Sequence, residues 1–269
     1  MIRFFTPERR KTAGHLLTEL GIVVAGVLIA LYAQQLDSDR QAKKRGAAAV
    51  ELIRTEMFSN SKLQMERIAL HACLRDRLAT IATKIARGDT DWAAFAYPPD
   101  PTRMTTIRRI YRSVFRPYNK DAFEGAVASS SLDVMDPGLQ ISLGRLYRQY
   151  DLADALQREE YALATKLDSL AVGGLIELAD QRQFLGTIAL LDRSNSLATI
   201  MAMQNLSTLQ DIGMYPTDEQ LREWKKSVAD KDLSTGSINI ARNRAFYGDC
   251  VDPSGFDFEK QAVSQRSIK

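Results

Sequence analysis

The feature that most constrains this chain is a long apolar run near its N-terminus, Leu16–Leu36, which reads LLTELGIVVAGVLIALYAQQL. Every residue from Leu20 to Ala33 is apolar or glycine. About 20 helical residues, each rising about 1.5 Å, cover the hydrocarbon core of a bilayer, which is roughly 30 Å thick. We therefore predict one transmembrane helix over residues 15–36.

Two other interpretations of this run remain. A cleaved signal peptide also combines a basic start with an apolar stretch, but it needs a small residue three positions before the cleavage site. The best local match, Leu31-Tyr32-Ala33, has leucine there. A helix buried in the core of a soluble protein is the third interpretation. The length of the run favours a membrane anchor over both.

The rest of the chain predicts an all-α protein in which the transmembrane helix continues into a bundle of long helices. Apolar residues make up 45% of the chain, enough for a substantial core, and they recur every three or four positions. The first helix is expected to begin at Thr6-Pro7 and to end at Gly88, with Asn60-Ser61 as a point where it can break. Further helices are expected within 119–136 and over 137–170, 175–191, 194–212 and 217–228.

These elements divide the chain into four parts: a short basic cytoplasmic tail (1–14), the transmembrane helix (15–36), a helical extracytoplasmic domain (37–252) and a flexible C-terminal tail (253–269). Basic residues flank both ends of the apolar run, so the positive-inside rule does not fix the orientation. A short tail ahead of a large domain is typical of a signal anchor. We therefore predict that the domain lies outside the cytoplasm.

Small residues in the predicted span lie four positions apart, as Gly21 and Ala25 and again as Gly26 and Ala30. This spacing lets a second membrane helix approach closely, which predicts association with another copy of the chain or with another membrane protein. The alternative is that glycine and alanine are simply common in membrane helices.

A cluster of arginines follows a proline-rich loop: Arg108, Arg109, Arg112 and Arg116. Three of them are spaced by four, so we predict a helix on which they share a face, and this face could bind anionic lipid headgroups or an acidic partner. The alternative is an ordinary solvated face that pairs with nearby carboxylates. Nucleic acid is not expected as a partner, because the net charge is only +3.

The two cysteines, Cys73 and Cys250, lie far apart in the sequence and leave two alternatives. In an oxidising compartment they would form a disulfide that ties the last segment to the first long helix. In the cytoplasm they would be two buried thiols.

No pattern of residues points to an active site. The chain has no H-E-x-x-H, G-x-S-x-G, Walker A or G-x-G-x-x-G motif, and its two histidines, His15 and His71, lack metal-ligand spacing. Paired acids such as Glu159-Glu160 are interpreted as solvated helix positions. We therefore predict no catalytic, cofactor-binding or metal-binding residues, no cofactor and no enzymatic activity.

Two stretches resemble known sequences. Residues 19–31, with VVAGVLIAL as their core, and the region from Phe123 through Ser131-Leu132 to Leu146-Tyr147 resemble a group of uncharacterised bacterial proteins. Those proteins have a short basic tail, one membrane span and a helical extracytoplasmic part. The resemblance covers about half of the chain, and Gln35-Leu36 stands where those proteins often have Asn-Trp. It implies a bacterial inner-membrane setting and brings no known activity.

Three functions fit these features. The first is a membrane-anchored scaffold or accessory protein that presents a helical domain, with the lipid bilayer and a second membrane helix as its partners. The second is an extracytoplasmic sensor or ligand-binding module, which would need a partner to signal. The third, an enzyme, is disfavoured by the missing motifs.

Overall fold

The computed structural model describes residues 7–97, 108–229 and Cys250, with side chains described from Glu19 onward and, in the second range, up to Glu223. The all-α prediction is confirmed, and one isolated β-bridge between Tyr97 and Arg109 is the only β-structure among these residues. The elements, in chain order, are α1 (Pro7–Arg87), α2 (Asp121–Ala128), the 3-10 helix η2 (Leu132–Val134), α3 (Pro137–Lys166), the 3-10 helix η3 (Asp168–Val172), α4 (Leu178–Asp211) and α5 (Asp218–Ala229).

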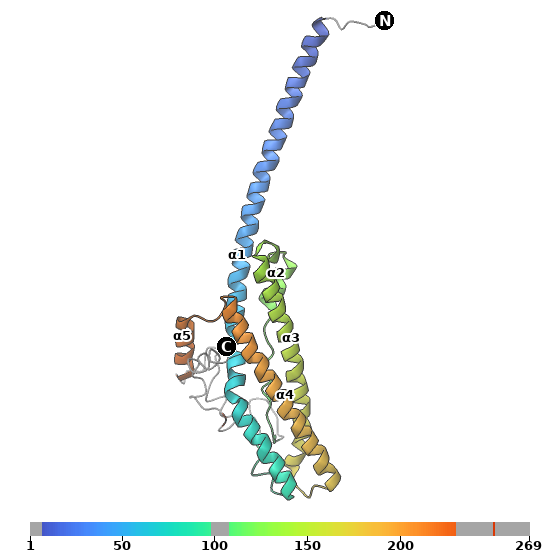
Figure 1. Cartoon of the computed structure of the whole chain (residues 1–269), viewed down its shortest axis with the longest axis vertical. Coiled ribbons are helices and arrows are strands. Elements are labelled where there is room, and N and C mark those ends of the chain that lie inside the picture. Colours follow the sequence, from blue (N-terminus) through green and yellow to red (C-terminus); the bar gives the residue numbers. More distant parts are fainter. Residues whose placement is uncertain (1–6, 98–107, 230–249, 251–269) are drawn as a thin grey trace.

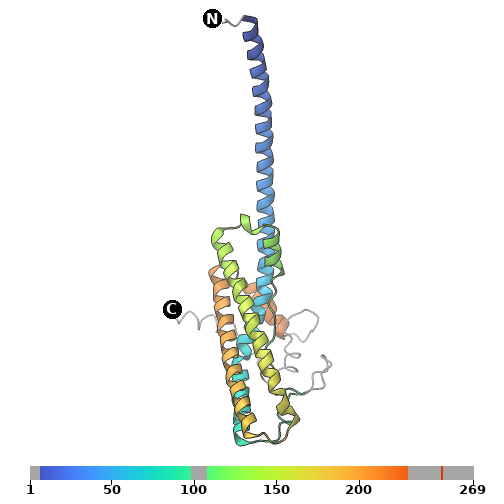
Figure 2. The same ribbon diagram turned by 90° about the vertical axis from the view of Figure 1, so that its right-hand side faces the viewer.

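Three long helices lie side by side in the bundle (Figure 1, Figure 2). The second half of α1 and the whole of α3 run in the same direction, away from the N-terminus, and α4 returns antiparallel and packs against both. The core consists of apolar side chains at helical spacing on their facing sides. Among its fully buried members are Ile53, Met57, Leu74, Leu78 and Ile81 of α1, Leu143, Leu146 and Tyr150 of α3, and Leu191, Ala202 and Leu209 of α4.

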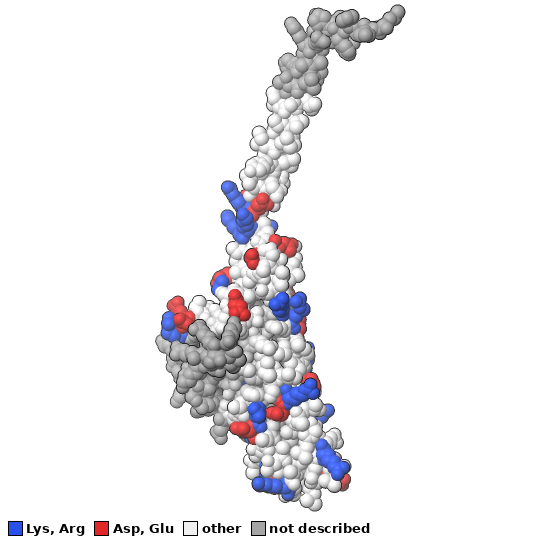
Figure 3. All heavy atoms as spheres, in the orientation of Figure 1, with Lys and Arg blue, Asp and Glu red and all other residues white. Residues whose placement is uncertain are grey.

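The first half of α1 projects alone from this bundle (Figure 3). Among the described residues, α1 is the one helix long and apolar enough to cross a membrane, and its most apolar stretch is not buried against any other part of the chain. The residues from Leu20 to Leu36 are exposed throughout. We call this stretch the apolar stalk.

α1 is uninterrupted over 81 residues, so the break considered at Asn60-Ser61 is wrong. The Ser61 hydroxyl donates to Phe58 O within the helix (2.8 Å), and the Asn60 amide is directed to the carbonyl of Asn119 (2.7 Å). Neither side chain therefore competes with the helical backbone bonds. The predicted end at Gly88 is confirmed.

Gly88 ends α1 because it adopts a left-handed conformation, with φ of +72°. Its amide donates to Ile85 O and the Asp89 amide donates to Lys84 O, both at 3.0 Å. This pair of bonds is the Schellman arrangement, which satisfies the last carbonyls of a helix and favours glycine at this position.

The predicted caps of two other helices are confirmed. Asp136 Oδ1 accepts from the Leu139 amide (2.9 Å) at the start of α3, where Pro137 is the first helical residue. Thr217 and Gln220 form a reciprocal capping box at the start of α5, with amide-to-side-chain distances of 2.9 and 3.2 Å.

The two helices predicted over 175–191 and 194–212 are one helix, α4. The polar residues between them do not break it, because Arg193 is exposed while Ser194 and Asn195 face the interior of the bundle. The predicted flexible tail, residues 253–269, lies outside the described residues.

The largest departure from prediction is the arginine-rich region, which is not helical. Residues 108–120, here called the extended segment, run antiparallel to α1, from Arg77 beside Ile110 to Asn60 beside Asn119. At 1.5 Å per helical residue these two points of α1 are roughly 26 Å apart, which is most of the roughly 30–32 Å that a fully extended chain from Ile110 to Asn119 can span. The segment thus occupies the space between α1 and α3.

The end of the bundle nearest the apolar stalk is fixed at Gly46. This glycine is buried against η2, and a Cβ placed on it would lie 2.5 Å from Cγ2 of Val134. The hairpin of α2 and η2 can therefore pack on α1 at this level only because position 46 has no side chain.

Replacing Gly46 by leucine should lower the free energy of unfolding of the bundle by about 1–3 kcal/mol, because Val134 and η2 must move away from α1. Ala47→Leu is the matched control, since Ala47 is exposed on the next position of the same helix. Denaturant unfolding followed by circular dichroism measures both variants. Equal stabilities for the two would show that η2 does not pack on Gly46.

Candidate functional site: the polar network around the extended segment

Polar side chains of α1 bind the backbone of the extended segment. Asn60 accepts a hydrogen bond from the Asn119 amide (2.9 Å) and donates one to its carbonyl (2.7 Å). Arg77 donates through Nε to Ile110 O (2.9 Å). An extended chain without a sheet partner leaves its amides and carbonyls unpaired. These side chains supply some of the hydrogen bonds that a neighbouring strand would otherwise make.

Side chains of α3 bind the same segment from the other side. Gln157 Oε1 accepts from the Arg116 amide (2.6 Å), and Asp154 Oδ1 accepts from the Tyr118 amide (3.1 Å). Both acceptors are buried. Side chains of two helices consequently hold the extended segment, one helix on each side. Their hydrogen bonds fix the position of the segment along α1 and α3.

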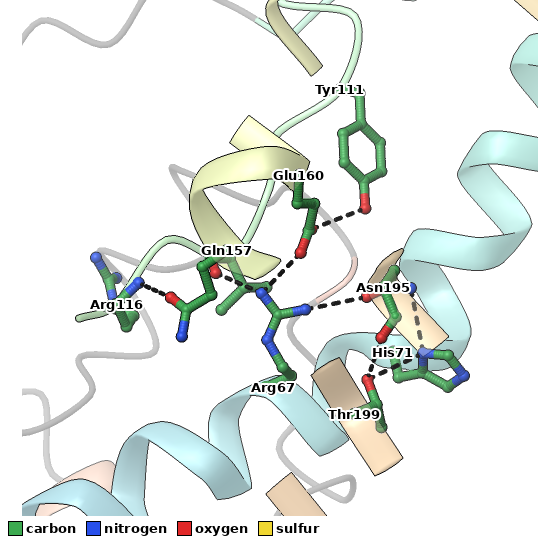
Figure 4. Close-up of polar contacts among 9 residues, drawn as sticks. Arg67, His71, Tyr111, Arg116, Gln157, Glu160, Asn195 and Thr199 are labelled. Atoms are coloured by element: carbon green, nitrogen blue, oxygen red, sulfur yellow. Dashed lines mark hydrogen bonds and ion pairs between the residues drawn. The ribbon is translucent and has the colours of Figure 1, made fainter. Parts of the chain in front are cut away.

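Arg67 of α1 lies at the centre of this network (Figure 4). Its guanidinium donates to Val114 O of the extended segment (2.5 Å), to Glu160 Oε2 of α3 (2.8 Å) and to Asn195 Oδ1 of α4 (3.4 Å). The other oxygen of Glu160 accepts from the Tyr111 hydroxyl (3.5 Å). One side chain thereby joins all three long helices and the segment between them.

The Arg67–Glu160 ion pair is closed to solvent, because the two side chains are only 2% and 0% exposed. Burial opposes the charge on Arg67, but the neighbouring Glu160 raises the pKa of its guanidinium above the ordinary value. A buried pair of this kind is costly to desolvate and is held together by its hydrogen bonds. It stabilises one arrangement of the chain strongly against any arrangement that separates the partners.

His71 extends the network toward the surface. Its Nδ1 lies 3.1 Å from Asn195 Nδ2 and 3.2 Å from Thr199 Oγ1 (Figure 4). An amide nitrogen can only donate, so Nδ1 is the acceptor and the imidazole is neutral. Burial, assisted by the positive charge of Arg75, lowers the pKa of His71 below its ordinary value, which agrees with this assignment.

Two carboxyl groups around the extended segment are also shifted by their burial. Burial raises the pKa of Glu66 even though Arg116 lies 3.4 Å away, and it raises the pKa of Asp154 even though that carboxylate accepts from the Tyr118 amide. The Tyr118 hydroxyl is buried as well, and its pKa is raised to about 12. These shifts follow from the burial of the three groups.

The geometry of the network suits it to holding the chain in place. Its charged centre is closed to any substrate. Arg67 and Asp154 bind the backbone of the extended segment, and Glu66 pairs with the side chain of Arg116. Within residues 19–97, 108–223 and Cys250, no group of three or more His, Cys, Asp or Glu side chains could hold a metal ion.

The structure corrects the prediction for Arg108, Arg109, Arg112 and Arg116. They do not share a helix face, because the segment is extended, and Arg112 is buried at 2% exposure. Arg116 pairs with Glu66, and Arg109 lies 4.0 Å from Asp168. The common helical face on which the contact with anionic headgroups was predicted is therefore absent from these four residues.

Cys73 and Cys250 form a disulfide, the first of the two predicted alternatives, with an S–S distance of 2.00 Å. It joins Cys250 to a residue 177 positions earlier, in the second half of α1. Gly21, Ala25, Gly26 and Ala30 lie exposed on the apolar stalk, and within the described residues no atom outside the helix's own backbone lies within 4 Å of a Cβ added at either glycine.

Sequence reasoning missed the polar network and misread Glu160, which is fully buried, as a solvated position. A signal was present. Asn60, Gln64 and Arg67 occupy the same helical stripe as the core residues Met57 and Leu74, at steps of three and four. Polar residues at core-facing positions indicate a polar partner in the interior, although they do not say which segment supplies it.

A second feature is a hollow of about 490 Å³ at the end of the bundle farthest from the stalk, where η3 turns into α4. Trp92, Leu170, Ile176 and Phe184 supply apolar walls, and Lys166, Asp180 and Gln183 supply polar groups. Three apolar side chains nearby are exposed to solvent: Val172, Leu175 and Leu178.

Comparison with known proteins adds no relative. No family model, no curated protein and no solved structure matches the chain significantly.

Replacing Arg67 by methionine should lower the free energy of unfolding by about 3–5 kcal/mol, because Glu160 is left as an uncompensated buried charge. Adding Glu160→Gln should recover part of this loss, since glutamine removes the charge and still accepts from Tyr111. Urea unfolding of the single and double variants measures the recovery.

Arg75→Met is the control, because Arg75 forms an exposed ion pair with Asp192 at 3.5 Å, worth at most about 1 kcal/mol. If Arg67→Met were no more destabilising than Arg75→Met, the network would not hold the bundle together.

Proposed function

We propose that this protein is a membrane-anchored, non-enzymatic scaffold or accessory protein that presents its helical bundle outside the cytoplasm, in the periplasm of a bacterium. The continuity of α1 carries the proposal. One helix supplies both the apolar stalk and a core wall of the bundle, without a hinge between them. A bundle mounted in this way is held at a fixed height above the membrane.

The height follows from the helix itself. Gly46, where η2 packs, lies ten residues beyond Leu36, where the apolar stalk ends. At 1.5 Å per residue, the bundle begins about 15 Å beyond the hydrocarbon core, just outside the headgroup layer. The far end of α1, at Arg87, is then about 75 Å beyond the core. The bundle can thus present contacts at a considerable distance from the membrane.

Two further observations support this placement and mode of action. Disulfides persist in oxidising compartments, so the Cys73–Cys250 bond supports a domain outside the cytoplasm. Among the described residues outside the helix's own backbone, none lies within 4 Å of a Cβ added at Gly21 or Gly26, which leaves the two pairs of small residues open to a second copy or to another membrane protein.

A sensor or ligand-binding module is the second candidate, favoured by the hollow at the far end of the bundle. Its walls combine apolar side chains with Lys166 and Asp180, a mixture typical of small-molecule sites. A small molecule retained by the purified full chain, and lost on Phe184→Ala, would favour this candidate over the scaffold.

The proposed placement predicts how the cysteines react in intact cells. Because the disulfide lies in the bundle, a membrane-impermeant maleimide should label Cys73 and Cys250 only after treatment with a membrane-impermeant reductant. The measurement is the mass shift of the full chain on a gel. Thiols that react without reductant, and only after lysis, would place the bundle in the cytoplasm and contradict the proposal.

A further inference from the structure

Four cations follow directly after the apolar stalk: Arg40, Lys43, Lys44 and Arg45. All four are exposed, and they lie on the part of α1 between the end of the stalk at Leu36 and the first contact with η2. Figure 3 shows Lys and Arg gathered on α1 where the uncharged stalk meets the bundle. The proposed function uses none of these residues.

Three of these cations lie together on one side of α1. At 100° per residue, Arg40, Lys43 and Lys44 fall within an arc of about 100°, whose centre is turned by about 120° from Gly46 and Ile53, which face the bundle. Among the described residues, none forms an ion pair with these three side chains. The arc is therefore a free cationic face.

The nearby carboxylates do not neutralise this face. Asp37 accepts a hydrogen bond from Gln41 (2.8 Å), and Asp39 accepts one from Gln35 (3.0 Å). Each carboxylate is thus engaged along the helix with a neutral amide. Counting all six charged residues of 37–45, the region retains a net charge of +2.

The cations also lie at the right height for headgroups. Arg40, Lys43 and Lys44 are about 6–12 Å beyond Leu36 along the helix axis. The Cα–Cβ bonds of a helix tilt toward its N-terminus, which here is the membrane side, and long basic side chains extend further in that direction. Their charged ends consequently reach the headgroup layer, which is roughly 5–8 Å thick on each side of a bilayer.

We propose that Arg40, Lys43 and Lys44 bind the phosphate groups of anionic phospholipids in the leaflet adjacent to the bundle. The inference rests on the proposed function, since it requires that the apolar stalk span the bilayer. It assigns to this arc the lipid contact that the sequence had led us to expect of Arg108–Arg116. Its effect is to fix the depth and rotation of α1, and thereby the position of the bundle over the membrane.

The test uses the full chain in lipid nanodiscs that contain spin-labelled phosphatidylglycerol or spin-labelled phosphatidylcholine. Electron paramagnetic resonance measures the fraction of each lipid that is motionally restricted by the protein. About 1 kcal/mol per basic residue near an anionic surface corresponds to a preference for phosphatidylglycerol of about fivefold or more, and it should fall at high salt. The variant Arg40→Gln/Lys43→Gln/Lys44→Gln should reduce the preference to nearly one.

Two control variants separate this face from other cations. Arg145→Gln/Arg148→Gln/Arg193→Gln removes three exposed charges from the bundle and should leave the preference unchanged. Arg9→Gln/Arg10→Gln/Lys11→Gln removes the charges at the other end of the stalk. Loss of preference in that variant alone, retention in the Arg40/Lys43/Lys44 variant, or no preference in the wild type would each overturn the proposal.

The same spectra report on the anchor separately. A helix that spans the bilayer restricts phosphatidylcholine too, so a restricted phosphatidylcholine signal without selectivity would leave the anchor standing and remove the headgroup site. Absence of restricted lipid of either kind would overturn both. Unchanged circular dichroism and thermal unfolding of each variant confirm that the bundle is folded.

Discussion

The bundle depends on the burial of an extended segment between helices. A buried backbone without a strand or helix partner carries amides and carbonyls that each cost free energy unless they are bound. Here Asn60 and Arg67 of α1 and Asp154 and Gln157 of α3 bind them. This requirement explains why the core-facing stripes of these helices contain polar residues. It also explains how α1 and α3 are joined although their backbones make little direct contact.

The same arrangement gives α1 its two roles. Since the polar network and the core fix its second half, the first half projects in a defined direction as a continuation of the same helix. Because no hinge interrupts the helix, the position of the stalk fixes the position of the bundle, as the proposed scaffold function requires. The exposed cations beyond the stalk and the close packing at Gly46 lie next to each other on α1. The junction between the apolar stalk and the bundle therefore combines a close helix contact with exposed positive charge.

Apolar periodicity and capping residues predicted most of the helices, because those signals are local. Asp136-Pro137, Thr217 to Gln220 and Gly88 each end or begin a helix through contacts within a few residues. The extended segment could not be predicted in the same way. Its apolar residues and arginines recur with helical spacing, and only Pro117, which disfavours helix at the preceding residue, argued against a helix. Its conformation depends on hydrogen bonds to side chains far away in the sequence. The buried polar network around Arg67 could not be predicted for the same reason.

Hydrogen exchange of its backbone amides shows whether the extended segment is held between the helices. The amides of Arg116, Tyr118 and Asn119 lie outside any helix but are bound to Gln157, Asp154 and Asn60. We predict that a peptide covering residues 110–120 exchanges as slowly as the core of α3, and that Asn60→Ala accelerates its exchange. Exchange at the rate of a surface loop in the wild-type protein would contradict this prediction, because the segment would then not be held between the helices.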